Sequence, residues 1–370
     1  MGRKLLKVYV IRPVRNFCLY HLARFIAGFR FIIPRKVADA WHGLLARIAY
    51  PFIKPLQKTV ENNLKIAYGD AYSKHEAYKF GKKLLVLLIH CLTDYIWLSG
   101  KKTRKEFSKF FTVEGEEYLQ EAYNRGKGVL CMVPHTCAWE FSAILPPVLG
   151  YETSAVSSKL RNPGLNQFII NLRESRGMKN ISRENSRGLK NISVKERCYD
   201  KLVAALNKGE CLIIMIDQDS VNIKGEFLQF FGHRAYSPLG VARLALDTEA
   251  TIVPMFTIRN NDGSYVFKIR PEVKMEITGD RNHDIIHNSQ IHNDIMESIV
   301  REYPEQWLWF HKRWKTTPES LAFHLKVRAD EWELARRADL RKQEEERKKE
   351  EQRQHREEQK QKIRNFFHRK

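Results

Sequence analysis

The sequence lacks the cysteine spacing that marks zinc and redox motifs. None of its six cysteines forms a Cys-x-x-Cys pair, and although Cys131 and Cys137 flank His135, no second pair lies at a matching distance. Structural zinc sites commonly draw their ligands from two such pairs. We therefore expect reduced, mostly buried thiols and no metal site.

The sequence also lacks an uninterrupted apolar run of the roughly 20 residues that a membrane-spanning helix needs. Residues 17–34 are interrupted by one histidine and two arginines, and residues 84–99 are shorter and carry His90 and Asp94. No signal-peptide cleavage pattern follows the N-terminus. We expect the chain to stay in the cytoplasm and lie on a membrane surface, with a tilted span over 17–34 as the alternative.

Acidic residues are almost missing from residues 1–60. This region has twelve lysines and arginines and a single acid, Asp39, so its net charge of +11 is about half of the total of +21. The basic residues alternate with large apolar ones, a composition typical of helices that lie in a membrane interface and unusual for nucleic-acid-binding arms. We therefore favour a membrane partner and no nucleic acid, with a non-enzymatic membrane- or nucleic-acid-binding protein as the competing hypothesis.

Residues 341–362 contain no apolar side chain, which excludes the apolar seam of a coiled coil. A solvated single helix held by Glu–Lys and Glu–Arg pairs, or a disordered charged segment, is expected there. We assign no catalytic role to this tail, which we place at residues 321–370.

Hydrophobic periodicity divides the rest of the chain into a helical, basic, membrane-associating region (1–125) and an α/β catalytic domain (126–320). In the second region strands and helices alternate, which predicts an α/β fold with a mixed sheet flanked by helices. The expected strands are 128–133, 153–157, 211–216, 251–258 and 265–269, and the expected helices are 138–148, 162–177, 195–208, 237–247 and 285–303.

His135 and Glu140 form a His-x4-Glu motif directly after the predicted strand 128–133. Active-site groups of α/β sheets lie just beyond the carboxyl ends of strands. Positions five apart in a helix diverge by about 140°, so the two side chains can meet only if His135 lies in the turn before the helix. A neutral imidazole could then deprotonate a hydroxyl while Glu140 fixes the ring. The spacing also occurs by chance, with the histidine as a satisfied surface residue.

The sequence resembles the lipid A late-acyltransferase family, within the wider glycerolipid acyltransferase group that carries the His-x4-Asp/Glu motif. Several blocks carry the resemblance, in the same order, over about residues 55–318. They are Asn63-Leu64 with Ala67-Tyr68; Gly128-Val129-Leu130 with His135 and Glu140; Arg161-Asn162-Pro163 with Leu172-Arg173 and Gly177; Gly209 with Asp217-Gln218-Asp219; Phe230-Phe231-Gly232 with Ala235, Gly240, Ala242 and Leu244-Ala245; and residues 304–309 with His311, Arg313 and Lys315-Thr316.

The resemblance implies transfer of a fatty acyl chain to a hydroxyl of a glucosamine-based lipid A precursor at the cytoplasmic face of the inner membrane. The acyl donor would be an acyl carrier protein thioester or acyl-CoA, and no cofactor is required. A different glycolipid acceptor, such as a phosphoinositol mannoside, is the alternative.

The resemblance also assigns catalytic residues. It makes His135 the general base, Glu140 its partner, and Arg173 the group that stabilises the thioester oxyanion or a substrate phosphate. Arg176 is near enough in sequence to take that last role. The expected substrate-binding residues are Arg161, Asn162, Arg176, Asp217, Gln218 and Asp219.

Asp217 and Asp219 follow the apolar strand 211–216, and their role has several readings. They could bind a metal, position a base or hold arginines. We favour hydrogen bonding to the loop that carries His135 or to Arg173. Phe230 and Phe231 fit either core packing or the wall of an acyl groove.

Overall fold

The computed structural model describes residues 33–160, 162–183 and 193–327, together with isolated residues between 16 and 28 and at 329 and 347. The chain forms two compact units. The larger contains Met1–Asn185 and Ser193–Thr316, and the smaller contains Ser186–Ile192 and Thr317–Lys370. In the smaller unit residues 318–327 are helical, and the Thr317 side chain accepts a hydrogen bond from the Ser320 amide. The predicted tail helix at 341–362 and most of the alternative span at 17–34 lie outside the described residues.

The larger unit is built on a seven-stranded sheet in the order β1-β9-β8-β2-β5-β3-β4. All neighbouring pairs are parallel except β8 and β9, which are antiparallel, so the predicted mixed α/β sheet is confirmed. The strands are β1 (Phe111–Glu114), β2 (Val129–Met132), β3 (Thr153–Ser158), β4 (Met178–Arg183), β5 (Cys211–Ile214), β8 (Thr251–Arg259) and β9 (Tyr265–Ile269).

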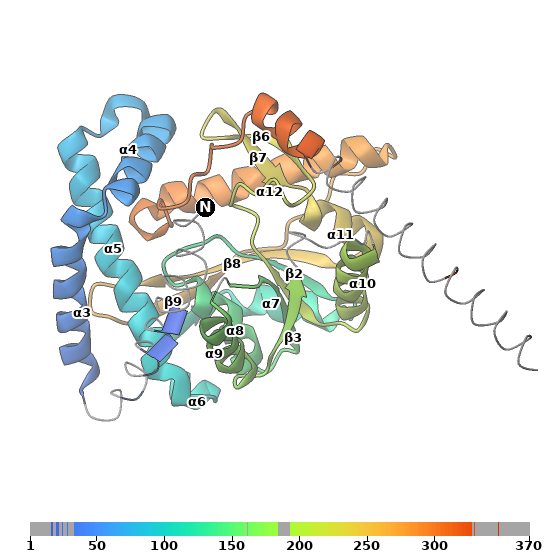
Figure 1. Ribbon diagram of the computed structural model, residues 1–370. Coiled ribbons are helices and arrows are strands. Elements are labelled where there is room, and N and C mark those ends of the chain that lie inside the picture. Colours follow the sequence, from blue (N-terminus) through green and yellow to red (C-terminus); the bar gives the residue numbers. More distant parts are fainter. Residues whose placement is uncertain are drawn as a thin grey trace, which may run out of the picture. The chain divides into compact units, whose positions relative to one another are not determined.

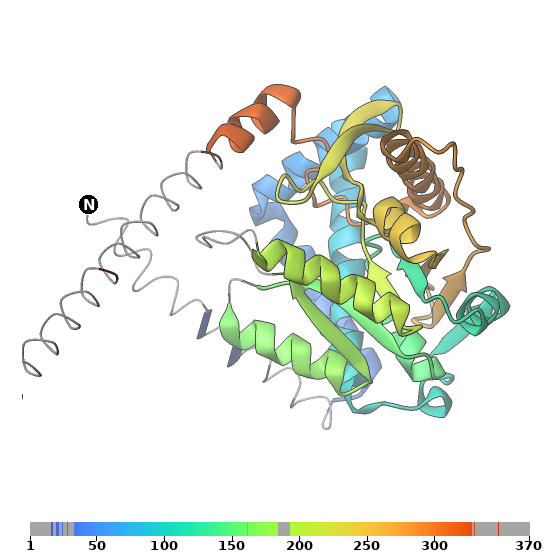
Figure 2. The same cartoon turned by 90° about the vertical axis from the view of Figure 1, so that its right-hand side faces the viewer.

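Helices flank this sheet (Figures 1 and 2). They are α3 (Arg35–Ala49), α4 (Lys54–Tyr68), α5 (Lys74–Trp97), α6 (Arg104–Phe107), α7 (Glu116–Asn124), α8 (Trp139–Leu149), α9 (Pro163–Glu174), α10 (Ser193–Asn207), α11 (Gly240–Thr248) and α12 (Arg281–Glu302). Strand β2 is central and all four of its residues are fully buried. A strand covered on both faces is expected to be continuously apolar, which explains why its sequence shows no alternation.

The structure differs from the predicted elements in three places. Strand β1 lies inside the region expected to be helical, and edge strand β4 was not predicted. A separate antiparallel hairpin, β6 (Gly225–Phe230) and β7 (His233–Pro238), was also missed. Its two-residue turn has positive φ at Phe231 and Gly232, the backbone that tight hairpins prefer. The helix expected from residue 237 therefore begins at Gly240, because Pro238 ends β7.

One helix among the described residues, Lys74–Gly100, is long and apolar enough to cross a membrane by length and composition. It comprises α5 and the turn that follows. Half of its most apolar window is buried inside the protein, as in a core helix. In Figure 1 α5 runs between α3 and the sheet.

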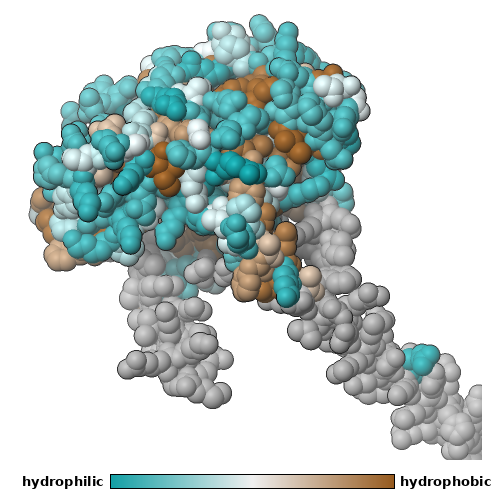
Figure 3. Space-filling view, turned by 90° about the horizontal axis from the view of Figure 1, so that it is seen from above, coloured by the Kyte–Doolittle hydropathy of each residue, from teal (hydrophilic) through white to brown (hydrophobic). Residues whose placement is uncertain are grey.

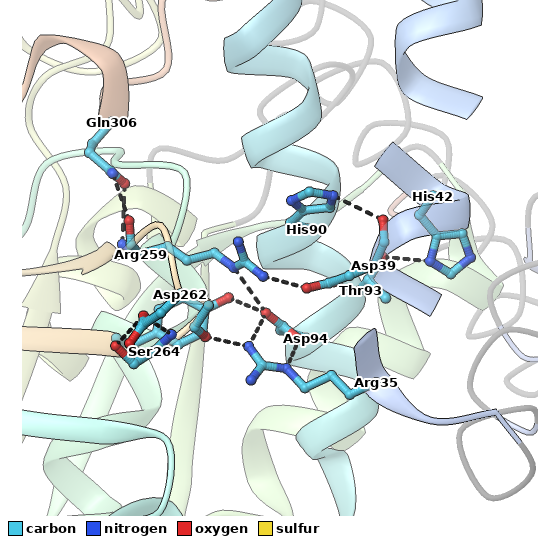
Figure 4. Close-up of polar contacts among 12 residues, drawn as sticks. Arg35, Asp39, His42, His90, Thr93, Asp94, Arg259, Asp262, Ser264 and Gln306 are labelled. Atoms are coloured by element: carbon cyan, nitrogen blue, oxygen red, sulfur yellow. Dashed lines mark hydrogen bonds and ion pairs between the residues drawn. The ribbon is translucent and has the colours of Figure 1, made fainter. Parts of the chain in front are cut away.

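A buried charge network joins α3, α5 and the β8–β9 hairpin (Figure 4). Asp94 of α5 is fully buried and accepts hydrogen bonds from Arg35 (2.7 Å, from Nη2), Arg259 (3.2 Å) and the Tyr265 hydroxyl (2.6 Å). Arg259 also pairs with Asp39 on α3. The network therefore connects the basic N-terminal part of the chain to the sheet at a defined position.

We predict that Asp94→Ala lowers the free energy of unfolding by about 3–5 kcal/mol, because it leaves two guanidinium groups without their buried partner. Chemical denaturation monitored by circular dichroism measures this loss. The control is Lys83→Ala, whose pair with Glu305 is exposed and 3.8 Å long, and which should change stability little. A loss of less than about 1 kcal/mol for Asp94→Ala would show that the network does not hold α3 in place.

Candidate active site

The loop after β2 carries His135 and is held by the segment that follows α12. The Leu308 amide donates to the His135 carbonyl (2.9 Å), and the Cys137 amide donates to the Gln306 carbonyl (2.6 Å). The Thr136 hydroxyl donates to the Thr257 carbonyl at 2.8 Å. Contacts from both sides thus fix the backbone of the loop just beyond the carboxyl end of the strand.

The partner of the His135 ring is Asp217, not the predicted Glu140. Its Nδ1 lies 2.6 Å from Asp217 Oδ1, and its backbone amide donates to Asp217 Oδ2 at 2.7 Å. Strands β2 and β5 are parallel and pair Met132 with Ile214, so residues three positions beyond these ends meet. Glu140 does not take this place, because it lies in α8 and pairs with Arg173 instead. Of the alternatives for the Asp-Gln-Asp segment, hydrogen bonding to the His135 loop is the one observed.

Asp217 is fully buried, and its carboxylate forms three hydrogen bonds. The Trp307 indole N–H donates to Oδ2 at 2.7 Å, beside the two contacts from His135. Burial opposes ionisation of this carboxyl group, but His135 and the Trp307 donor outweigh it and lower the Asp217 pKa to about 2. Asp217 is therefore an anion that orients the imidazole and leaves Nε2 as the ring nitrogen available to a substrate.

Glu140 lies in the first turn of α8 and forms a two-point ion pair with Arg173 of α9. Arg173 Nη2 donates to Oε1 at 2.6 Å, and Nε donates to Oε2 at 3.0 Å. The Trp139 indole also donates to Oε1 at 3.1 Å, and its ring centroid lies 6.1 Å from that of His135. Burial works against the charge of Arg173, yet Glu140 raises the Arg173 pKa. Trp139, whose ring lies near that of His135, thus also contacts the Glu140–Arg173 pair.

Asp219, the second acid of the Asp-Gln-Asp segment, connects the site to the segment that follows α12. This segment, residues 304–316, is here called the closing segment. The Asp219 carboxylate accepts from the Thr316 amide (2.8 Å) and hydroxyl (2.6 Å), and Lys315 donates to the Asp219 carbonyl. The Asp219 amide donates to Nε2 of His311 at 3.0 Å. Asp219 therefore holds the closing segment beside the Asp-Gln-Asp segment, and both of its carboxylate oxygens accept hydrogen bonds from protein groups.

The remaining predicted substrate-binding residues fall into different places. Arg161 lies outside the described residues. Asn162 caps α9 by accepting from the Leu165 amide at 3.1 Å. Arg176 is only 3% exposed, stacks on Tyr95 and donates to the Tyr95 carbonyl, so its position indicates a structural role. Gln218 is partly exposed between the two buried acids.

Sequence reasoning missed two groups of the site, Trp307 and His311. The sequence indicates both as members of the last block of the family pattern and as part of an aromatic cluster that fits either a membrane interface or the core, with no link to His135. Because more than 80 residues separate Trp307 from Asp217, no local spacing signals their contact. Within the described part of the chain, no cluster of three His, Cys, Asp or Glu residues could hold a metal ion.

The fold is an α/β sheet in which a buried aspartate and a half-buried histidine meet at the carboxyl ends of adjacent parallel strands, the edge where α/β sheets place their ligand sites. The model of the family described as bacterial lipid A biosynthesis acyltransferase matches residues 14–316. The chain belongs to this family.

Several curated proteins are similar to the chain. A lipid A biosynthesis acyltransferase of Haemophilus influenzae is 26% identical over 58% of this chain and 61% of its own length. The lipid A biosynthesis palmitoleoyltransferase of Escherichia coli is 25% identical over 74% of this chain and 83% of its own length. A phosphatidylinositol mannoside acyltransferase of Mycolicibacterium smegmatis is 23% identical over 54% of this chain and 60% of its own length.

We predict that His311 makes the protein acid-sensitive. Burial, then the nearby Lys315, lowers the His311 pKa to about 4, against about 6.5 in an unfolded chain. The unfolded chain therefore binds a proton between pH 6.5 and 4 that the folded protein does not, and stability falls as the pH falls through this window. His311→Gln should weaken the fall in unfolding free energy by roughly 2–3 kcal/mol.

Denaturation curves at pH 7 and pH 4.5 measure this difference. Part of the pH dependence should remain in the variant, because burial also lowers the His292 pKa to about 4. The exposed His233 supplies the control variant His233→Gln, which should follow the wild type. Parallel curves for wild type and His311→Gln would contradict the prediction.

Proposed function

We propose that the protein transfers a fatty acyl chain from a thioester to a hydroxyl of a glucosamine-based lipid A precursor, with His135 as the general base. The observation that carries this proposal is the pairing of buried Asp217 with half-buried His135 at the carboxyl end of β2, in a chain of the lipid A biosynthesis acyltransferase family. Membership of the family supports the reaction class, and the contact of His135 with Asp217 supports His135 as the base.

In the proposed reaction, Nε2 of His135 removes the acceptor hydroxyl proton as the oxygen attacks the thioester carbon. The carbon–sulfur bond then breaks, and the imidazolium returns the proton to the leaving thiolate. Asp217 holds the ring through Nδ1 and stabilises its charged form during the reaction. Trp307 and the His135 amide keep Asp217 in place, which makes Trp307 a positioning residue.

Glu140 and Arg173 act as a unit in this proposal. Glu140 occupies two of the five N–H groups of Arg173 and thereby sets the direction in which the others point. Arg173 would stabilise the thioester oxyanion or a phosphate of the acceptor. Gln218, the partly exposed member of its segment, is the best placed of the described predicted binding residues to contact the acceptor.

The family supports a lipid acceptor and an acyl donor in general, and their identities are part of the proposal. An acyl carrier protein thioester or acyl-CoA is the proposed donor, and the cytoplasmic face of the inner membrane is the proposed location. The similarity to a phosphatidylinositol mannoside acyltransferase supports a second candidate acceptor, a mannosylated phosphoinositide.

We predict that His135→Ala lowers kcat for acyl transfer at least about a thousandfold and that Asp217→Asn lowers it about a hundredfold or more, with the fold retained. Glu140→Gln and Arg173→Ala should each cost about tenfold to a hundredfold. The double variant should be no worse than the poorer single variant, because the two side chains form one unit. Transfer of a radiolabelled acyl group to purified acceptor lipid measures these rates.

The control is His75→Ala, which removes an exposed histidine and should leave the rate unchanged. Near-normal turnover of His135→Ala would eliminate the proposed base. The same assay, run with a glucosamine-based acceptor and with a phosphatidylinositol mannoside, separates the two acceptors. Faster transfer to the mannoside would replace the lipid A precursor as substrate while leaving the base assignment intact.

A further inference from the structure

Helix α3 exposes a continuous apolar stripe. The stripe, here called the α3 outer face, consists of Val37, Trp41, Leu44, Leu45 and Ile48, with Phe52 in the turn that follows. The helical members are between 45% and 60% exposed, and Phe52 is 81% exposed. Their spacing of three and four residues places them on one side of the helix. On the face of the molecule shown in Figure 3, by contrast, hydrophilic residues predominate.

The opposite side of α3 is fastened to the protein. Arg35 and Asp39 enter the buried charge network with Asp94 and Arg259 (Figure 4). Gly43 lies so close to α5 that an added Cβ would come within 2.6 Å of the His90 ring. The helix therefore cannot turn its apolar side inward without breaking buried ion pairs.

The exposed charged residues of α3, and of α4 up to Lys58, are all basic, whereas the half-buried Glu61 on α4 is acidic. Lys36 and Arg47 on α3 and Lys54 and Lys58 on α4 are exposed. The only acid on α3, Asp39, is paired with Arg259 on the inner side. Such a surface is complementary to a bilayer, because the apolar side chains can contact acyl chains while the basic residues contact anionic headgroups.

We propose that the α3 outer face is the surface by which the protein docks on an anionic phospholipid bilayer. Trp41 and Phe52 would lie at the boundary between the headgroups and the acyl chains, with their rings in contact with the upper part of the acyl chains. A second copy of the chain is a poorer occupant, because symmetric pairing of this face would bring the basic residues of both copies together. The inference deepens the proposed function and rests on it for its purpose, since the acceptor lipid resides in the same bilayer.

The first test measures binding to vesicles made of phosphatidylglycerol and phosphatidylcholine, by flotation. The variant Trp41→Gln/Leu45→Gln/Ile48→Gln should lower the partition coefficient about tenfold or more. The matched control is Leu160→Gln/Ile277→Gln/Ile286→Gln, which changes three apolar residues of 40–60% exposure elsewhere and should bind as the wild type does. Circular dichroism and thermal unfolding verify that both variants are folded.

The second test locates the contact. Brominated phospholipids quench tryptophans that enter the acyl region, so they should quench the wild type more than Trp41→Phe. The control variant Trp41→Phe/Ile277→Trp restores the number of tryptophans at an exposed position outside α3 and should not regain the quenching. Equal quenching of wild type and Trp41→Phe, or unchanged flotation of the triple α3 variant, would overturn the proposal.

These readouts do not depend on catalysis. His135→Ala should float with vesicles as the wild type does, so failure of the proposed acyl transfer leaves the docking result interpretable. Conversely, the triple α3 variant should keep near-wild-type turnover on acceptor dispersed in detergent and lose it on acceptor in vesicles. Equal loss in both would show that α3 supports the fold instead of docking, and would overturn the proposal. A shift from dimer to monomer in this variant, with vesicle binding unchanged, would assign the face to a second copy.

Discussion

The contact between the carboxylate of Asp217 and the ring of His135 organises the site, and most of the surrounding structure maintains it. The parallel pairing of β2 with β5 sets the two residues at equal distances beyond the strand ends. The segment after α12 then closes over them, where Leu308 binds the His135 carbonyl and Trp307 binds Asp217. The buried carboxylate of Asp217 is stabilised because it accepts hydrogen bonds from the His135 amide and ring and from the Trp307 indole. Asp217, which orients the His135 ring, thus follows a different strand from the one that precedes His135.

This arrangement explains which parts of the site were predictable from the sequence. His135 is predictable because the His-x4-Glu motif directly follows a short apolar run that marks a buried strand. Its partner was predicted wrongly, because a five-residue spacing suggested Glu140 whereas the contact with Asp217 depends on strand order. The acids 217 and 219 were recognised as important, and the hydrogen bond to the His135 loop was the favoured reading. Trp307 could not be linked to Asp217, since only the packing of the closing segment brings them together.

Some elements of the fold could be predicted from local sequence, whereas others depend on contacts between distant residues or on an uncommon backbone conformation. Long periodic or wholly apolar segments such as β2, β8 and α12 were recognised, because burial dictates their residues. The hairpin β6–β7 was missed since its turn uses Phe231 in a backbone conformation that side chains seldom adopt. The buried charge network was also invisible, because Arg35, Asp94 and Arg259 lie far apart in sequence. That network fixes α3 with its apolar side outward. The composition of the region suggested association with a membrane but not the orientation of this helix.

The orientation of His135 by Asp217 is tested most directly by nuclear magnetic resonance of protein labelled with ¹⁵N in histidine. An Nδ1–H proton that is hydrogen-bonded to a buried carboxylate resonates at low field. It also exchanges slowly, because the carboxylate keeps it away from solvent. This His135 resonance should be present in the wild type and in Glu140→Gln, and it should be lost or strongly shifted in Asp217→Asn. Loss of the resonance in Glu140→Gln, with its persistence in Asp217→Asn, would show that Glu140 and not Asp217 orients His135.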